Sequence, residues 1–133
     1  MNKVLIIDDD SGVHSIIHAI IQKKMPDCVF SSAYNGIDGI KAALDEQPDA
    51  IILDVGMPGI DGFETCRRLK EDERTRHIPV VMFSGMVTDS DSVDTALESG
   101  ADMILAKPLR NDHLIRVFRS LLKAEAKEEP VPD

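Results

Sequence analysis

Acidic side chains stand directly after two short apolar segments of the sequence. Three consecutive aspartates, residues 8–10, follow apolar residues 4–7, and Asp54 follows apolar residues 50–53. Apolar segments this short are typical of strands that are buried on both faces of a parallel sheet. A carboxylate at the end of a buried strand costs free energy unless it is neutralised or used, so these aspartates are candidates for chemistry. The alternative is an ordinary loop aspartate that starts a turn.

Two more polar side chains follow the later apolar segments. Ser84 comes after residues 80–83, and Lys107 comes after residues 103–106. Three aspartates and one lysine in a single crevice would leave a net charge of about −2, which a divalent cation would neutralise. Carboxylates and backbone carbonyls are hard oxygen ligands, which suit Mg²⁺. A carboxylate beside such an ion can attack a phosphoryl group and form an acyl phosphate.

The elements that would position these side chains alternate along the chain. Strands are predicted at residues 4–7, 28–34, 50–54, 78–83 and 103–106, and helices at 11–25, 37–47, 63–71, 89–99 and 114–122. This alternation predicts an α/β fold with a parallel sheet, helices on both faces and right-handed crossovers. The flavodoxin-like strand order 2-1-3-4-5 fits best and gives a three-layer (βα)5 sandwich. Ligands bind such sheets beyond the carboxyl ends of strands one and three, where the aspartates are predicted.

The first helix has an apolar stripe and two histidines. The stripe consists of Val13, Ile16, Ile17, Ile20 and Ile21. This spacing predicts one buried helix face, with a cap formed by Asp10 or Ser11 at the start and an end before Pro26. His14 and His18 stand on the flank of the stripe, and a solvated flank is favoured over a zinc pair because no third ligand is evident.

The later helices are patterned in the same way. The residues expected to face the core are Ile37, Ile40 and Leu44, then Phe63, Cys66 and Leu69, and then Val93, Ala96 and Leu97. The basic side chains of Arg67, Arg68 and Lys70 are expected on a solvated face. Cys28 and Cys66 are isolated in the sequence, so we expect two reduced, buried thiols.

The composition excludes several classes of protein. A chain of 133 residues with 43% hydrophobic and 29% charged residues indicates one globular domain. The net charge of −9 and the aromatic content of 4% argue against direct binding of nucleic acid. No apolar segment approaches the length of a membrane span, and residues 1–3 show no signal-peptide layout, so a cytoplasmic protein is expected.

Four motifs stand at the predicted strand ends. They are IIDDD (6–10), LDVGMPGIDG (53–62), VVMFSG (80–85) and ILAKPL (104–109). Together and in this order, the motifs resemble those of the receiver domains of two-component response regulators, the CheY-like family. The resemblance covers residues 2–122.

This resemblance implies a role for each candidate residue. Asp54 would be the phosphoacceptor. Asp9, Asp54 and the backbone carbonyl of Gly56 would bind Mg²⁺ directly, and Asp8 would reach the ion through water. Lys107 would contact the phosphoryl group.

The resemblance also implies how the domain would switch. Ser84 matches a serine or threonine whose hydroxyl bonds a phosphoryl oxygen and pulls its loop inward. Ile104 stands where the family often has an aromatic residue, so readout by an aromatic rotamer is not expected. Gly56 is smaller than many residues at its position, and easier access for water would make the phosphoryl state short-lived. The Lys107–Pro108 bond would be cis.

A receiver of this kind would be a phosphorylation-dependent switch rather than a conventional enzyme, since it would catalyse only its own phosphorylation and dephosphorylation. A sensor histidine kinase or a histidine phosphotransfer protein would donate the phosphoryl group, and the first helix would help to dock it. Helix four, strand five and helix five would contact a downstream protein target, and a phosphorylation-dependent dimer is a further option. The receiver would span residues 1–122, followed by a charged tail or linker stub at 123–133.

Three alternatives share part of this pattern. A haloacid-dehalogenase-like phosphohydrolase would use Asp8 as its nucleophile, but Gly12 stands where that family has threonine or valine, and the motif at 53–62 would have no role. A flavin-binding flavodoxin would place its phosphate beside residues 8–10, which would repel it. A scaffold that is not phosphorylated would leave the whole residue set without a purpose.

Overall fold

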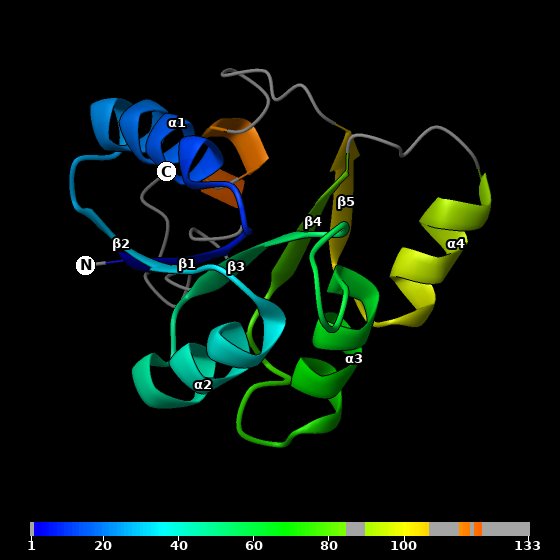
Figure 1. The fold of residues 1–133 in the computed structure, drawn as a ribbon. Helices are drawn as coiled ribbons and strands as arrows, with labels where there is room; N and C mark the ends of the chain where they lie inside the picture. The colour runs from blue at the N-terminus through cyan, green and yellow to red at the C-terminus, as the bar shows by residue number, and fades with distance from the viewer. Residues whose placement is uncertain (1, 85–89, 107–114, 118, 121–133) are drawn as a thin grey trace, which may run out of the picture.

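Strands and helices alternate along the chain as the sequence predicts (Figure 1). The computed structural model describes residues 2–84, 90–106, 115–117 and 119–120. The strands are β1 (Asn2–Ile7), β2 (Cys28–Ala33), β3 (Ala50–Asp54), β4 (Val80–Ser84) and β5 (Met103–Ala106). The helices are α1 (Ser11–Lys24), α2 (Gly36–Glu46), α3 (Gly62–Glu71) and α4 (Ser90–Glu98). Residues 115–117 and 119–120 are also helical.

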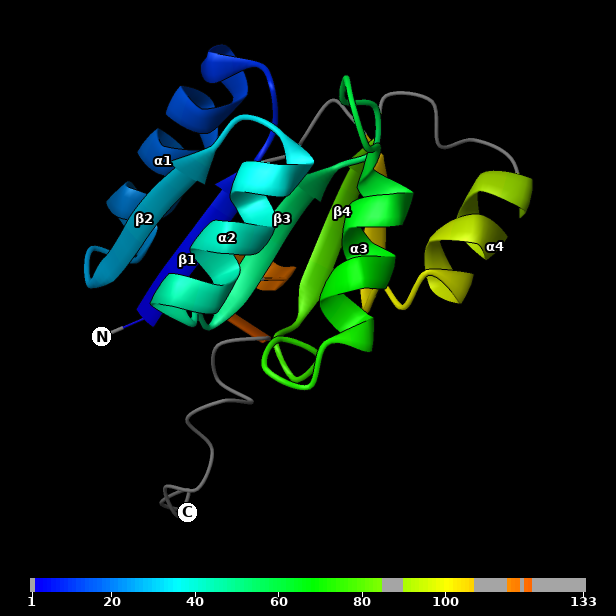
Figure 2. The same cartoon turned by 60° about the horizontal axis from the view of Figure 1, so that its bottom comes forward.

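The strands form one parallel sheet in the order β2-β1-β3-β4-β5. Figures 1 and 2 show helices on both faces of it. The predicted flavodoxin-like class and strand order are therefore confirmed. Ile7 pairs with Leu53 and Asp54 pairs with Phe83, so the carboxyl ends of three neighbouring strands are level. This register brings the loop after β1 and the end of β3 to the same edge of the sheet.

At the N-terminus of three helices, a side chain caps the backbone N–H groups. Asp10 caps α1, Asn35 caps α2 and Asp61 caps α3, and each accepts a hydrogen bond from a backbone N–H at 2.8–2.9 Å. Such caps satisfy backbone donors that have no partner inside the helix. Asp10 is one of the two caps expected from the sequence, and α1 ends at Lys24 as the following proline requires.

α1 covers one face of the sheet together with the helical residues 115–117. The buried cluster on this face contains Val4, Ile6, Ile17, Ile21, Cys28, Ala50, Ile52, Val81, Phe83, Leu105, Ile115 and Val117. The buried face of α1 is rotated from the predicted one. His14 is only 6% exposed, whereas Ile16 is 58% exposed, so both of these predictions were wrong. His18 is exposed, as expected.

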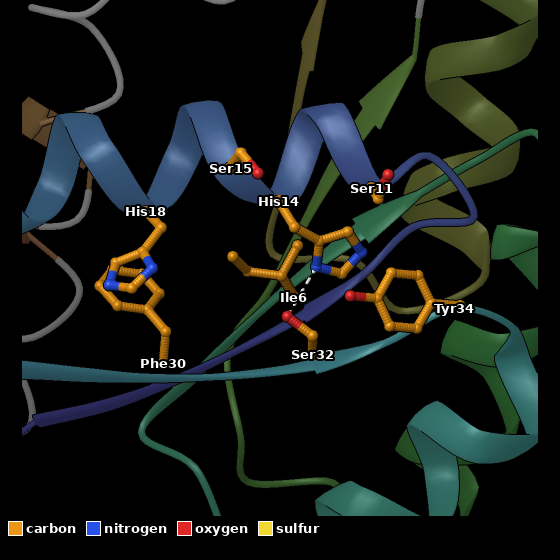
Figure 3. Close-up of a pocket in the computed structure, with 8 residues that line it drawn as sticks. All are labelled: Ile6, Ser11, His14, Ser15, His18, Phe30, Ser32 and Tyr34. Atoms are coloured by element: carbon orange, nitrogen blue, oxygen red, sulfur yellow. Dashed lines mark hydrogen bonds between the residues drawn. The ribbon is translucent and has the colours of Figure 1, made fainter.

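Two ring contacts join α1 to β2 and to the residue that follows it (Figure 3). The ring of His14 stacks on Tyr34, with centroids 4.5 Å apart, and the ring of His18 stacks on Phe30, with centroids 4.8 Å apart. Ring contacts of this kind add to the free energy gained by burying the surface itself. Both histidines thus contact aromatic rings of this segment, but only His14 is buried, and Ile16 remains exposed.

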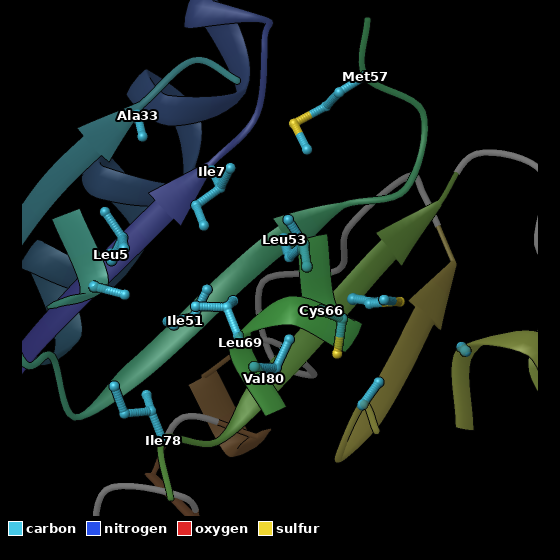
Figure 4. Close-up of a cluster of buried hydrophobic side chains, with 14 residues drawn as sticks. Leu5, Ile7, Ala33, Ile51, Leu53, Met57, Cys66, Leu69, Ile78 and Val80 are labelled. Atoms are coloured by element: carbon cyan, nitrogen blue, oxygen red, sulfur yellow. The ribbon is translucent and has the colours of Figure 1, made fainter. Parts of the chain in front are cut away.

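α2, α3 and α4 cover the other face (Figure 4). The buried cluster there contains Leu5, Ile7, Ala33, Ala43, Ile51, Leu53, Met57, Cys66, Leu69, Ile78, Val80, Met82, Ala96 and Ala101. Ile37 and Leu97 were expected in this core, but they are 44% and 54% exposed. The buried positions of α2 are instead small, and a Cβ on Gly39 would lie within 3 Å of the Ile7 side chain. Small residues bring α2 close to the sheet, and Ile37 remains exposed while Ile40 packs at the edge of the cluster.

Lys70 also departs from the expected solvated face of α3. Its Nζ donates to the Asp102 carboxylate at 3.0 Å and to the Ile78 carbonyl at 2.7 Å, and its side chain is only 17% exposed. Arg67 and Arg68 are exposed, as expected. The ammonium group of Lys70 thus joins α3 to the segments that flank β4 and β5.

The two cysteines are buried, as expected. Burial raises the pKa of both the Cys28 and the Cys66 thiol. Among the described residues, no helix has the length and apolar character that a membrane crossing requires. The predicted cis Lys107–Pro108 bond and the predicted tail at 123–133 lie outside the described residues.

Candidate functional site

Three carboxylates meet at the carboxyl edge of the sheet. Asp8 and Asp9 follow β1, and Asp54 ends β3. One carboxylate oxygen of each residue lies within 4.8 Å of the others. Asp8 is 2% and Asp54 7% exposed, while Asp9 is open to solvent. The structure thus brings together the aspartates that the sheet topology placed at one edge.

Backbone hydrogen bonds hold the loops that carry these carboxylates. The N–H of Asp8 donates to the carbonyl of Ala33 at 3.1 Å, and the Oδ1 of Asp8 accepts from the N–H of Asp10 at 2.9 Å. Beyond β3, the N–H of Val55 donates to the carbonyl of Phe83 at 3.0 Å. Each loop is therefore tied to a neighbouring strand, which presents the carboxylates from a well-supported backbone.

The imidazole of His14 contacts the same loop, which the sequence pattern did not reveal. Its Nε2 lies 2.7 Å from the carbonyl oxygen of Asp8, and its Nδ1 lies 2.9 Å from the Oγ of Ser32. Figure 3 shows the ring between α1 and β2. The spacing of His14 with Ile17 and Ile21 is a signal that could have placed it on the buried face.

The oxygen donors fit a hard divalent cation. Oxygens that bind one Mg²⁺ directly lie at most about 4.2 Å apart, which is twice the usual Mg–O distance. The three carboxylate oxygens lie within 4.8 Å of one another, which is comparable to that limit, so they lie close enough to share one ion. A cation would also relieve the repulsion between three neighbouring negative charges, two of which are buried.

The other predicted site residues are only partly described. Gly56 is exposed, two positions after Asp54, and a Cβ built on it would meet nothing within 4 Å. Ser84 ends β4, but its side chain, like the whole of Lys107, lies outside the described part of the chain. Ile104 of β5 is half-buried and packs against the apolar cluster under α2, α3 and α4.

The family model of the response regulator receiver domain matches residues 4–119. The chain belongs to this family. It is a receiver domain of the kind found in two-component response regulators, which is a signalling domain. The family match leaves the haloacid-dehalogenase-like alternative, with Asp8 as nucleophile, without support.

Two curated proteins are similar to this chain along most of its length. The DNA-binding dual master transcriptional regulator RpaA of Synechocystis is 37% identical over 123 residues, which are 92% of this chain and 50% of RpaA. Protein PilH of Pseudomonas aeruginosa is 31% identical over 122 residues, which are 92% of this chain and 98% of PilH. The chain therefore spans half the length of RpaA and nearly all of PilH.

A solved structure agrees with these sequence comparisons. The signal receiver domain of a DNA-binding response regulator from Colwellia psychrerythraea superposes with a TM-score of 0.86 at 30% identity. The superposition covers 92% of this chain and 99% of that domain. The fold is therefore that of a receiver domain throughout the compared region.

Proposed function

We propose that Asp54 is the phosphoacceptor of a phosphorylation-dependent switch that uses Mg²⁺. The observation that carries this proposal is the cluster of three carboxylates, within 4.8 Å of one another, at the carboxyl edge of a receiver fold. Asp9, Asp54 and the carbonyl of Gly56 would hold the ion, with Asp8 acting through water. When bound, Mg²⁺ supplies neutralisation of the charge on the phosphoryl oxygens.

The proposed reaction transfers a phosphoryl group from a nitrogen atom of the donor histidine to a carboxylate oxygen of Asp54. A carboxylate oxygen of Asp54 attacks the phosphorus atom of a phosphohistidine on the donor protein. The new O–P bond forms as the P–N bond breaks, and the donor imidazole leaves and takes up a proton from solvent. Hydrolysis of the acyl phosphate later returns the carboxylate. The receiver supplies position and charge for these two steps and acts on no other substrate.

Lys107 and Ser84 complete the proposal. The lysine ammonium would pair with a phosphoryl oxygen, and the hydroxyl of Ser84 would hydrogen-bond to another. The register of β4 and β5, in which Ser84 pairs with Ala106, supports this arrangement because it puts both strand ends at the edge that carries Asp54. The cis form of the Lys107–Pro108 bond stays a prediction.

The partners follow from the same chemistry. The donor would be a sensor histidine kinase or a histidine phosphotransfer protein. The readout would be a protein contact on the face of α4, β5 and the helical residues 115–117 and 119–120. The net charge of −9 argues against direct binding of DNA by this domain. A cytoplasmic location, a phosphorylation-dependent dimer and a receiver boundary near residue 122 stay predictions.

Intact mass after incubation with acetyl phosphate tests the proposal. The wild type and Asp10→Asn should each gain one phosphoryl group in the presence of Mg²⁺, and Asp54→Asn should gain none. Asp10 is a matched control because it adjoins the cluster in sequence, is exposed and caps α1, and asparagine is an equally good cap.

Three other results would overturn the proposal or part of it. An adduct that survives Asp54→Asn but is lost in Asp8→Asn would favour the phosphohydrolase alternative. An absence of any adduct in the wild type would leave a scaffold that is not phosphorylated. An adduct that forms equally well without Mg²⁺ would remove the metal from the proposal.

A further inference from the structure

His14 links the groove between α1 and β2 to the acidic cluster. A surface groove of about 220 Å³ lies between these elements, and His14 is the buried histidine on its wall (Figure 3). Its Nε2 contacts the carbonyl oxygen of Asp8, a residue that also donates its N–H to Ala33 and accepts from the N–H of Asp10 through its carboxylate. The imidazole is therefore part of the support of the loop after β1.

The partner of Nε2 defines the tautomer of the neutral imidazole. The carbonyl oxygen of Asp8 has no hydrogen, so the Nε2 of His14 must carry the proton of that hydrogen bond. In the neutral ring, Nδ1 is then an acceptor, and the hydroxyl of Ser32 can donate to it at 2.9 Å. Ser32 thus orients the ring so that its one N–H points at Asp8. This relay of a polar group, an imidazole and a loop carbonyl resembles the outer support that tunes metal sites in general.

We propose that His14 is a positioning residue of the acidic cluster, which sets the affinity for Mg²⁺ by holding the backbone of Asp8. The inference rests on the proposed function because it assumes that the cluster binds the ion. Asp8 is only 2% exposed, so water cannot readily replace the imidazole N–H. We expect that loss of this donor lets the loop shift, and that the Asp8 and Asp9 carboxylates shift with it.

His18 offers a matched control on the same helix. It lines the same groove, one helical turn farther along, and stacks on Phe30 much as His14 stacks on Tyr34. A change from histidine to phenylalanine keeps an aromatic ring at either position and removes the ring nitrogens. The two variants therefore share the loss of a histidine, and only His14→Phe loses the contacts with Asp8 and Ser32.

The experiment is a calorimetric titration of the unphosphorylated full chain with MgCl₂. We expect His14→Phe to weaken Mg²⁺ binding by about 10-fold, which is the lower end of what the loss of an outer partner costs a metal site. His18→Phe should bind Mg²⁺ as the wild type does. His14→Gln should recover most of the lost affinity, because its amide nitrogen can take the place of Nε2 and donate to the same carbonyl.

The outcomes separate this inference from the proposed function. If the wild type binds no Mg²⁺, the metal is removed from the proposed function, and the inference fails with it. If the wild type and His14→Phe bind equally well, the inference alone fails. Equal weakening by His14→Phe and His18→Phe would assign the effect to ring packing and would also overturn it. Should His14→Phe not fold, Ser32→Ala takes its place, since it keeps the imidazole but removes the group that orients it, and unchanged affinity there would contradict the relay.

Discussion

A side chain on Gly62 would collide with the backbone of Asp54. Gly62 is the first residue of α3, and its N–H donates to the carbonyl of Val55 at 2.8 Å. A Cβ built on it would overlap the carbonyl oxygen of Asp54 and lie 2.7 Å from the Cα of Val55. Both neighbours are backbone atoms, so no side-chain rotation can relieve the overlap. The start of α3 thus packs directly against the end of β3.

Replacement of Gly62 by alanine should therefore lower stability. We expect the free energy of unfolding to fall by about 1–3 kcal/mol, the usual cost of an overpacked site. Gly56→Ala is the control, because Gly56 is exposed and a Cβ there meets nothing, and its effect should stay within about 0.5 kcal/mol. Urea denaturation followed by circular dichroism measures both. Equal stability of the two variants would mean that α3 can shift without cost.

The sequence was sufficient to predict the architecture. Short apolar segments alternating with amphipathic segments leave few topologies, and in the flavodoxin-like order the ends of the first and third strands are neighbours. Asp8, Asp9 and Asp54 could be placed together for that reason alone. Their convergence required no knowledge of side-chain contacts, because the strand register determines it.

Partners that are distant in sequence could not be predicted in this way. The prediction from helical periodicity places apolar residues on the buried face of a helix, so it chose Ile16 rather than His14 for the buried face of α1. That prediction was wrong because both ring nitrogens of His14 find partners in the fold, at Ser32 and at the carbonyl of Asp8. Lys70 was misplaced for the same reason, since its acceptors come from other elements of the fold.

Gly56 should govern the lifetime of the phosphoryl group. Gly56 is exposed and has no side chain that could shield the acyl phosphate on Asp54, so we expect water to reach that phosphate readily. The rate of hydrolysis should fall severalfold from the wild type to Gly56→Met, with Gly56→Ala in between, because a larger side chain excludes more water. Intact mass measured over time after removal of the phosphodonor gives the rate. A slow wild type, or a rate independent of side-chain size, would refute this explanation.

The two thiols should be unreactive in the native state. Cys66 is 0% and Cys28 8% exposed, and burial raises the pKa of each thiol, so little of the reactive thiolate is present at neutral pH. We expect iodoacetamide at pH 7.5 to label neither residue in buffer and both in urea. Mass spectrometry of digested protein assigns the labels. Rapid labelling of Cys66 in buffer would show that α3 opens away from the apolar cluster of Figure 4.

Lys70 should contribute more to stability than the other basic residues of α3. Its Nζ donates to Asp102 and to the Ile78 carbonyl from a largely buried position, so Lys70→Met leaves acceptors without their charged donor. We expect a loss of about 1.5–3 kcal/mol in the free energy of unfolding. Arg68→Met is the matched control, because it breaks an exposed ion pair with Glu64 on the same helix, and such pairs contribute about 0–1 kcal/mol. Urea denaturation of both variants measures the difference. Equal losses would mean that solvent replaces the partners of Lys70 as easily as those of Arg68, and that α3 is held to β4 by apolar packing alone.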